Sequence, residues 1–86
     1  MIEVNKDMSP TVFIDNGYRF FFFSREETCM HVHVHCADGE AKFWIEPGLE
    51  LERSHGVSQK QLREMKKLIE EHRDDITNAW NEHFRH

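Results

Sequence analysis

The strictest pattern in the chain is an alternation over residues 30–36, which read MHVHVHC. In an extended strand, successive side chains point to opposite sides, so the three histidines share one side and the apolar side chains share the other. A second alternating segment, residues 40–46, follows directly after Asp38-Gly39. The two segments predict a hairpin with one apolar, buried side and one polar side, which carries His31, His33 and His35.

A two-residue turn at Asp38-Gly39 fixes the register of this hairpin, because the residues on either side of the turn must then pair in order. The register pairs each histidine with one residue of the second strand: His31 with Glu46, His33 with Trp44, and His35 with Lys42. The polar sides of the two strands coincide in this register. Trp44 is then the one large ring among polar neighbours.

Three further segments complete the predicted sheet. Residues 11–14 and 18–24 are β-branched and aromatic runs separated by Asp15-Asn16-Gly17, and Asn-Gly between such runs is a strong hairpin signal. Residues 48–53 alternate leucine with glutamate and predict an edge strand whose charges discourage pairing with other chains. The sequence therefore predicts an antiparallel sheet of four to five strands built from two hairpins.

The pattern changes to helical spacing near residue 57. Ser58 and Gln61 form a capping box, and apolar side chains recur on one stripe at residues 62, 65, 68 and 69. The first helix therefore begins at a well-defined position.

Apolar spacing resumes from Ile76 to Phe84. One unbroken helix over residues 59–85 would be about 40 Å long, more than the roughly 30 Å expected of a compact domain of this size. We therefore expect a break near residues 73–75, with Asp74 or Asp75 as the N-cap of a second helix. The predicted fold class is α+β, with one or two C-terminal helices packed on one face of the sheet.

Length and composition limit the class of protein. We expect one domain over residues 9–86, with the sheet in 9–56 and the helical part in 57–86, and a loose leader at residues 1–8. The 16 acidic and 11 basic side chains give a net charge of −5, which disfavours sequence-independent nucleic-acid binding. No apolar run approaches the ~20 residues of a membrane span. Cys29 and Cys36 lie too far apart in one extended strand for a disulfide, so we expect a cytoplasmic protein.

The histidine row first suggests metal binding. Neighbouring histidines on one side of a strand lie about 6.5 to 7 Å apart at the backbone, and two imidazoles can converge on an ion about 2.0 to 2.1 Å from each nitrogen. The predicted ligands are His31 and His33, with Glu46 from across the hairpin, and the metal would be zinc, nickel or copper. Nothing in the sequence requires a cofactor. The alternative is that the histidines only cover a half-exposed sheet face or pack against Trp44.

Acid–base catalysis is a second interpretation of the same row. A small nuclease could use His31 and His33 as acid and base, with Arg19 or Lys42 stabilising the developing charge. The chain has no glycine-rich phosphate loop and no activated nucleophile motif, and its negative charge repels a polyanionic substrate. The sequence therefore favours a role other than that of an enzyme.

Protein–protein interaction is the third and favoured interpretation. Trp44 lies among histidines on a sheet side that the core does not require, near an exposed edge. The predicted contact residues are Trp44, His33 and His35, and the partner is another protein or a second copy of the chain.

Six stretches carry a family resemblance in the same order along the chain: residues 10–13, 16–22, 31–34, 39–47, 62–64 and 80–84. They resemble the bacterial domain-of-unknown-function family number 4160. Members of that family are small and are sometimes labelled as toxin–antitoxin components, because a second small gene often lies beside theirs. The resemblance implies His31 and His33, rather than His35, as shared positions. With the negative charge, it implies the non-toxic, regulatory partner of a two-gene module.

Overall fold

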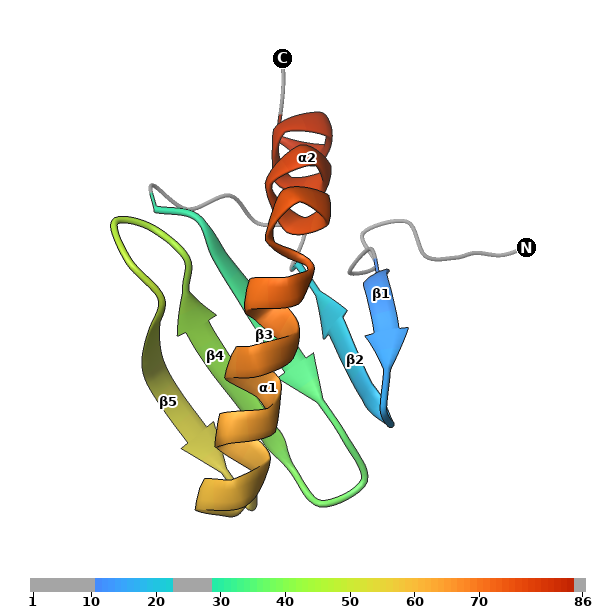
Figure 1. Ribbon diagram of the computed structural model, residues 1–86, viewed down its shortest axis with the longest axis vertical. Helices are drawn as coiled ribbons and strands as arrows, with labels where there is room; N and C mark the ends of the chain where they lie inside the picture. Colours follow the sequence, from blue (N-terminus) through green and yellow to red (C-terminus); the bar gives the residue numbers. More distant parts are fainter. Residues whose placement is uncertain (1–10, 23–28, 85–86) are drawn as a thin grey trace, which may run out of the picture.

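The computed structural model describes residues 11–22 and 29–84. The described elements form one antiparallel sheet, in chain order, followed by two helices (Figure 1). They are β1 (Thr11–Asp15), β2 (Tyr18–Phe21), β3 (His31–His35), β4 (Glu40–Trp44), β5 (Glu50–His55), α1 (Gln59–Glu71) and α2 (Arg73–His83). The α+β class is confirmed, and the five strands and two helices lie within the predicted four to five strands and one or two helices. The predicted leader, residues 1–8, lies outside the described residues.

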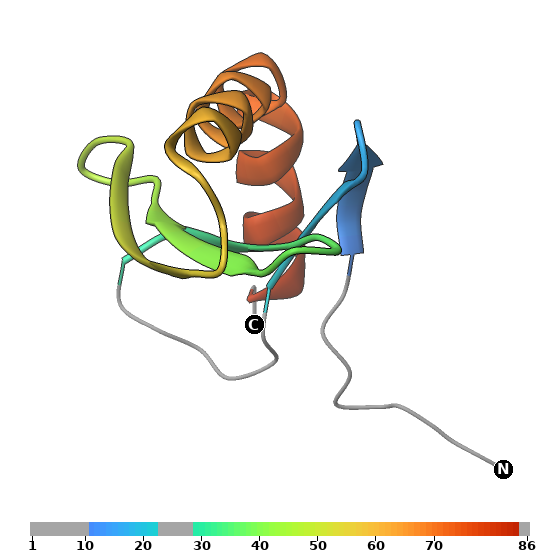
Figure 2. The ribbon, with the colours of Figure 1, turned by 90° about the horizontal axis from the view of Figure 1, so that it is seen from below.

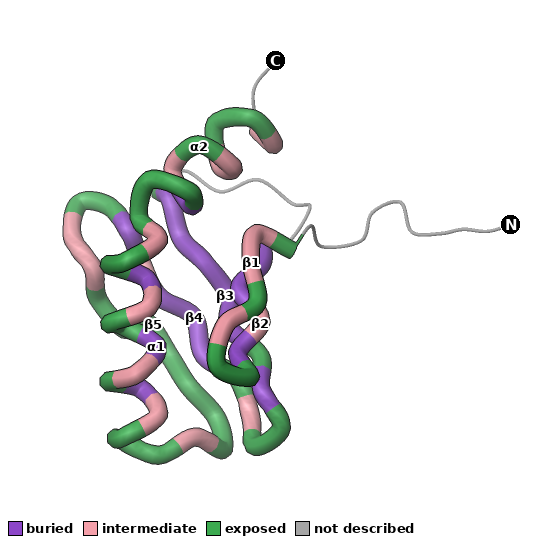
Figure 3. The backbone as a smooth tube through the Cα atoms, turned by 45° about the vertical axis from the view of Figure 1, so that its right-hand side comes forward, coloured by how far each residue is buried: buried purple, intermediate pink, exposed green. Residues whose placement is uncertain are grey.

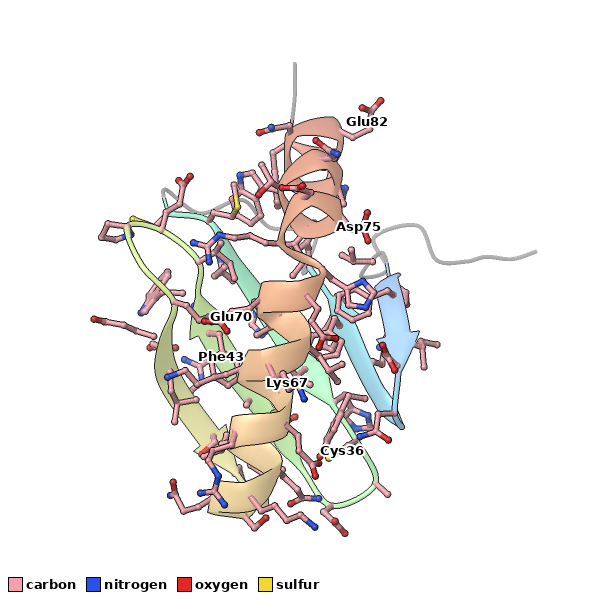
Figure 4. The ribbon with its side chains drawn as sticks, viewed as in Figure 1. Cys36, Phe43, Lys67, Glu70, Asp75 and Glu82 are labelled. Atoms are coloured by element: carbon pink, nitrogen blue, oxygen red, sulfur yellow. The ribbon has the colours of Figure 1, made fainter. Side chains whose placement is uncertain are left out.

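The core lies between the sheet and α1, which crosses one face of the strands, while α2 continues past the end of the sheet at which β3 begins (Figures 1 and 2). Phe43 lies on β4 where α1 crosses it (Figure 4). The most deeply buried apolar side chains come from both layers: Phe20, Phe22, Val32, Val34, Phe43 and Ile45 from the strands and the residues that follow them, and Met65, Ile69 and Ile76 from the helices. Leu62 of α1 is also buried in this core. The predicted helical stripe is confirmed, with Leu68 packed at its margin.

The first hairpin has the predicted turn. Asn16 and Gly17 both have positive φ, 55° and 82°, between the paired residues Asp15 and Tyr18. Positive φ at both central residues is the requirement of a type I′ turn, which Asn-Gly satisfies best.

The second hairpin has a different turn, and the predicted register is wrong by two residues. The observed pairs are His31 with Trp44, His33 with Lys42, and His35 with Glu40. The turn residues are 37 and 38, because the Cys36 N–H donates to the Gly39 carbonyl at 2.9 Å. Neither Asp38 nor Gly39 has the positive φ of a type I′ turn. A shift of two residues keeps every side chain on its predicted side, so the histidines still share one face.

Gly39 is required by a close backbone approach rather than by the turn. A Cβ atom at Gly39 would overlap the carbonyl oxygen of His55 and lie 2.9 Å from the Cα of Gly56. Gly56 itself has a φ of 80°. The β3–β4 turn is therefore packed against the junction between β5 and α1, which places the C-terminal end of β5.

The start of α1 is the predicted capping box and is also joined to that turn. The Gln61 N–H donates to Ser58 Oγ at 3.1 Å, and the Ser58 N–H donates to Gln61 Oε1 at 2.8 Å. Gln61 Nε2 donates to Asp38 Oδ2 at 2.8 Å. On the next turn of α1, Glu64 accepts a 2.6 Å hydrogen bond from the Tyr18 hydroxyl, and burial together with this bond raises the pKa of Tyr18 to about 12.

The break between the helices occurs at His72, one residue before the predicted range. The His72 N–H still donates to the Leu68 carbonyl, at 3.0 Å, and none of the described side chains caps α2. The prediction that Asp74 or Asp75 is the N-cap is therefore wrong. Both lie in the first turn of α2, where negative charge interacts favourably with the helix dipole.

The side chain of His72 connects the junction between α1 and α2 to β1, an edge strand of the sheet. Its Nδ1 lies 3.2 Å from Asp75 Oδ2, and its Nε2 lies 3.2 Å from Asp15 Oδ2 on β1. The imidazole also stacks on Phe13, with ring centroids 3.9 Å apart. The hydrogen bond with Asp75, reinforced by Asp15 and opposed by partial burial, raises the pKa of His72 above its usual value.

We expect the stability that His72 provides to depend on pH. A raised pKa in the folded state contributes stability that is complete below the pKa of the unfolded chain, about 6.5, and is lost as the pH rises through the folded value. Urea unfolding should therefore show a larger difference between wild type and His72→Gln at about pH 6 than at about pH 8. An equal difference at both pH values would contradict the role of His72. His35→Gln, on an exposed histidine, is the control.

Candidate functional site

The side of the sheet opposite α1, which we call the histidine face, carries polar and aromatic side chains in rows across the strands. The register of β2 to β5 defines a middle row of Phe21, His33, Lys42 and Arg53. The row toward the β3–β4 turn consists of Arg19, His35, Glu40 and His55. The row toward the start of β3 consists of His31, Trp44 and Glu50.

Burial differs sharply across the histidine face. His31, His33 and Lys42 are only 1%, 7% and 6% exposed, although all three are polar. His35 is exposed. All residues of β5 are exposed as well (Figure 3). The interpretation that the histidines cover a half-exposed face therefore fits His35 but not the two histidines before it. The accessible part of the face lies along β5 and the turn.

His31 is held by a backbone carbonyl and two indole rings. Its Nδ1 lies 3.1 Å from the carbonyl oxygen of Cys29, and because a carbonyl only accepts, Nδ1 carries the proton. The ring makes edge contacts with Trp44 and with Trp80 of α2, at centroid distances of 5.8 and 5.2 Å. The expected packing of a histidine against Trp44 is thus present at His31.

The predicted metal ligands are not brought together. Trp44, not Glu46, lies opposite His31, and Glu46 is exposed beyond the end of β4. The rings of His31 and His33 are neighbours, 5.1 Å apart and nearly perpendicular. Across residues 11–22 and 29–84, no group of three or more His, Cys, Asp or Glu side chains could hold a metal ion. The described geometry therefore supplies a histidine pair without the third ligand that we predicted.

A cavity of about 140 Å³ lies over the middle row of the histidine face. The polar residues that line it are His33, Glu40, Lys42, Arg53, Ser54 and His55, and Phe21 forms part of its wall. Lys42 Nζ lies 4.6 Å from the ring centroid of Trp44 and 3.8 Å from Glu52 Oε1. Glu52 Oε1 is also 3.0 Å from an Arg53 nitrogen, so this carboxylate forms ion pairs with two cationic side chains.

The catalytic candidates are divided between two parts of the face. His33 lies opposite Lys42 beside the cavity. Arg19 lies opposite His35, donates to Thr11 Oγ1 at 2.7 Å and covers the Phe21 ring at 4.4 Å.

Arg53 and His55 line the cavity but were not predicted. The alternation of residues 48–53 indicated a strand that ends too early, and the extra residue Glu52 between the paired residues Leu51 and Arg53 changes the side on which later side chains lie. The charges at these positions were the one signal that could have directed attention to the second half of β5.

The fold and the site define a small α+β protein in which an antiparallel meander buries one face under helices and presents a row of histidines and cations on the other. The family model for the domain of unknown function DUF4160 matches residues 17–81. The chain belongs to this family, which confirms the resemblance. The matched region contains β2 to β5 and all of α1, so the histidine row lies inside the family domain.

No curated protein and no solved structure matches the chain. Within the described part of the chain, neither helix is long and apolar enough to cross a membrane.

Proposed function

We propose that the protein is a protein–protein interaction module that engages its partner through strand β5. One observation carries the proposal: all six residues of β5 are exposed, and among the described strands β5 pairs on one side only, with β4. The outer edge of such a strand offers backbone N–H and C=O groups, to which an extended segment of another protein can add. Backbone pairing supplies affinity, and the side chains along the edge supply selectivity.

Side chains on both sides of β5 extend the contact surface. Leu51 is 41% exposed on the helix side, and Arg53 and the half-buried Trp44 lie on the histidine face. Arginine and tryptophan are enriched among the residues that contribute most to binding. Of the predicted contact residues, Trp44 and His35 remain in this proposal. His33 is buried, so it packs beneath the surface and does not contact the partner.

The biological setting that we propose is a regulatory, non-toxic role in a two-gene toxin–antitoxin-like system. The net charge of −5 supports this role, because an acidic protein complements a basic, nucleic-acid-cleaving partner and speeds their encounter.

Co-purification with the product of the adjacent small gene tests the function. We expect capture of that product, with a dissociation constant that rises roughly tenfold or more in Leu51→Asp and Arg53→Glu. Ile14→Asp is the matched control, because Ile14 is 69% exposed on β1 at the opposite edge of the sheet. A wild-type chain that is strictly monomeric and captures nothing would overturn the proposal.

Nucleic-acid cleavage, as in a small nuclease-like toxin, is a second candidate, and the cavity beside His33, Lys42 and Arg53 favours it. An imidazole can transfer the proton while the two cations stabilise developing negative charge. RNA or DNA degradation should then be lost in His33→Ala with an unchanged circular dichroism spectrum, and should persist in His35→Ala, outside the cavity. Intact nucleic acid after incubation with the wild type would exclude this candidate.

A further inference from the structure

We propose that the partner at this edge is a second copy of the chain, whose β5 pairs antiparallel with the first and joins two five-stranded sheets into one. The inference rests on the proposed interaction at β5 and names its occupant. It comes from two features of this strand, the position of its bulge and the order of its charges.

The bulge gives β5 the geometry for pairing with itself. Glu50 and His55 are five residues apart, so a regular strand would point them to opposite sides of the sheet. The extra residue, Glu52, changes this: Glu50 and His55 lie opposite Trp44 and Glu40, which share the histidine face. Directly opposed residues of two antiparallel strands must lie on the same side of the sheet. Glu50 can therefore face His55 of a second copy, with the twofold axis at the bulge.

The order of charges makes this arrangement favourable. β5 reads Glu-Leu-Glu-Arg-Ser-His, acidic in its first half and basic in its second. In the antiparallel pair, Glu52 faces Arg53 of the second copy, Glu50 faces its His55, and both contacts repeat by symmetry. Leu51 faces Ser54 on the helix side. A parallel arrangement would place each charge opposite its own kind, and directly opposed like charges are destabilising. The charges thus select the antiparallel direction.

The same features explain why this edge would favour a copy of the chain over strands with a different order of charges. Charges and bulges on an edge strand hinder pairing with most sequences. A strand with the complementary order of charges is attracted at each charged position. Other strands are repelled there, so the charges make the edge selective for a copy of the chain. β1, the other edge, reads Thr-Val-Phe-Ile-Asp and has a single charge, so it lacks this complementarity.

At the axis, the existing contacts around Glu52 would extend into a network. Glu52 already lies 3.0 Å from Arg53 and 3.8 Å from Lys42 of its own chain. The second copy would bring another Arg53 to the same carboxylate. Because these groups are partly exposed, salt screens them, and the dimer should weaken as ionic strength rises.

Charge reversals at the axis test the proposal by sedimentation equilibrium of the purified chain. We expect a wild-type dimer and a dissociation constant that rises roughly tenfold or more in Glu52→Arg and in Arg53→Glu, because each change opposes like charges twice. An equimolar mixture of the two variants should recover the dimer, since two arginines of one then face two glutamates of the other. The chain with both changes should dimerise alone. Circular dichroism checks that each variant is folded.

Glu71→Arg and Lys66→Glu are the matched controls, because both residues are exposed and belong to α1 rather than to β5. A wild type that stays monomeric at all concentrations would overturn the inference, and so would a dimer that every variant retains or a mixture that does not recover it. A monomer that still captures the adjacent gene product through β5 would refute only the self-pairing. A monomer that captures nothing would refute the proposed function as well.

Discussion

Gly39→Ala should lower the free energy of unfolding by about 3 kcal/mol, the upper end of the usual cost of forcing extra volume into a packed site. The added Cβ would overlap the carbonyl oxygen of His55 and lie 2.9 Å from the Cα of Gly56. Both neighbours are backbone atoms, so no side-chain rotation can relieve the contact. The β3–β4 turn must move away from the end of β5, which also strains the hydrogen bond between Gln61 and Asp38.

Gly48→Ala is the matched control, because a Cβ there meets no atom of the described residues within 4 Å and the residue does not have positive φ. We expect it to change stability by less than about 0.5 kcal/mol. Urea unfolding of both variants measures the difference. Equal midpoints would show that the turn and the end of β5 are not in close contact. Because this contact positions β5, Gly39→Ala should also weaken any association through that strand, whereas Gly48→Ala should not.

The sequence predicted the elements well because each had a local signal. Strand alternation, Asn16-Gly17 and the capping box at Ser58 depend on residues within a few positions of one another. The side of each side chain was also predictable, because the error in register was an even number of residues and left the alternation unchanged. The division of the sheet into a buried face and a histidine face could therefore be predicted without knowledge of the correct turn.

The register itself depended on a distant contact that the sequence does not reveal. Cys36-Ala37-Asp38-Gly39 suits a turn with Asp-Gly at its centre, but it also suits one that ends with glycine. In the observed turn, which ends with glycine, Gly39 lies close to His55 and Gly56. The observed turn places Lys42 beside His33 and separates Glu46 from the histidines. The candidate site therefore differs from the predicted one.

Two other errors share this cause. The N-cap of α2 is His72 rather than Asp74 or Asp75, and the side chain of His72 contacts Asp15 and Phe13 of β1. Arg53 and His55 were missed because the bulge at Glu52 interrupts the alternation of β5. In each case a contact between segments distant in the sequence, or an irregularity that only pairing reveals, determines what lies at the site.

Phe43→Ala should lower the free energy of unfolding by about 4 kcal/mol, because the side chain is fully buried between β4 and α1 and its removal leaves a cavity. The same residue can also report the register. Val32 lies directly opposite Phe43, whereas Val34 lies opposite Ala41. The turn predicted from the sequence would instead place Val34 opposite Phe43.

Double-mutant cycles distinguish the two registers. Directly opposed side chains lie about 5 Å apart at Cβ and diagonal ones about 7 to 8 Å, so coupling should be stronger for the opposed pair. We expect Phe43→Ala and Val32→Ala to couple by about 1 kcal/mol in urea unfolding, and Phe43→Ala and Val34→Ala by clearly less. The reverse order would restore the Asp38-Gly39 turn. Glu46 would then lie opposite His31.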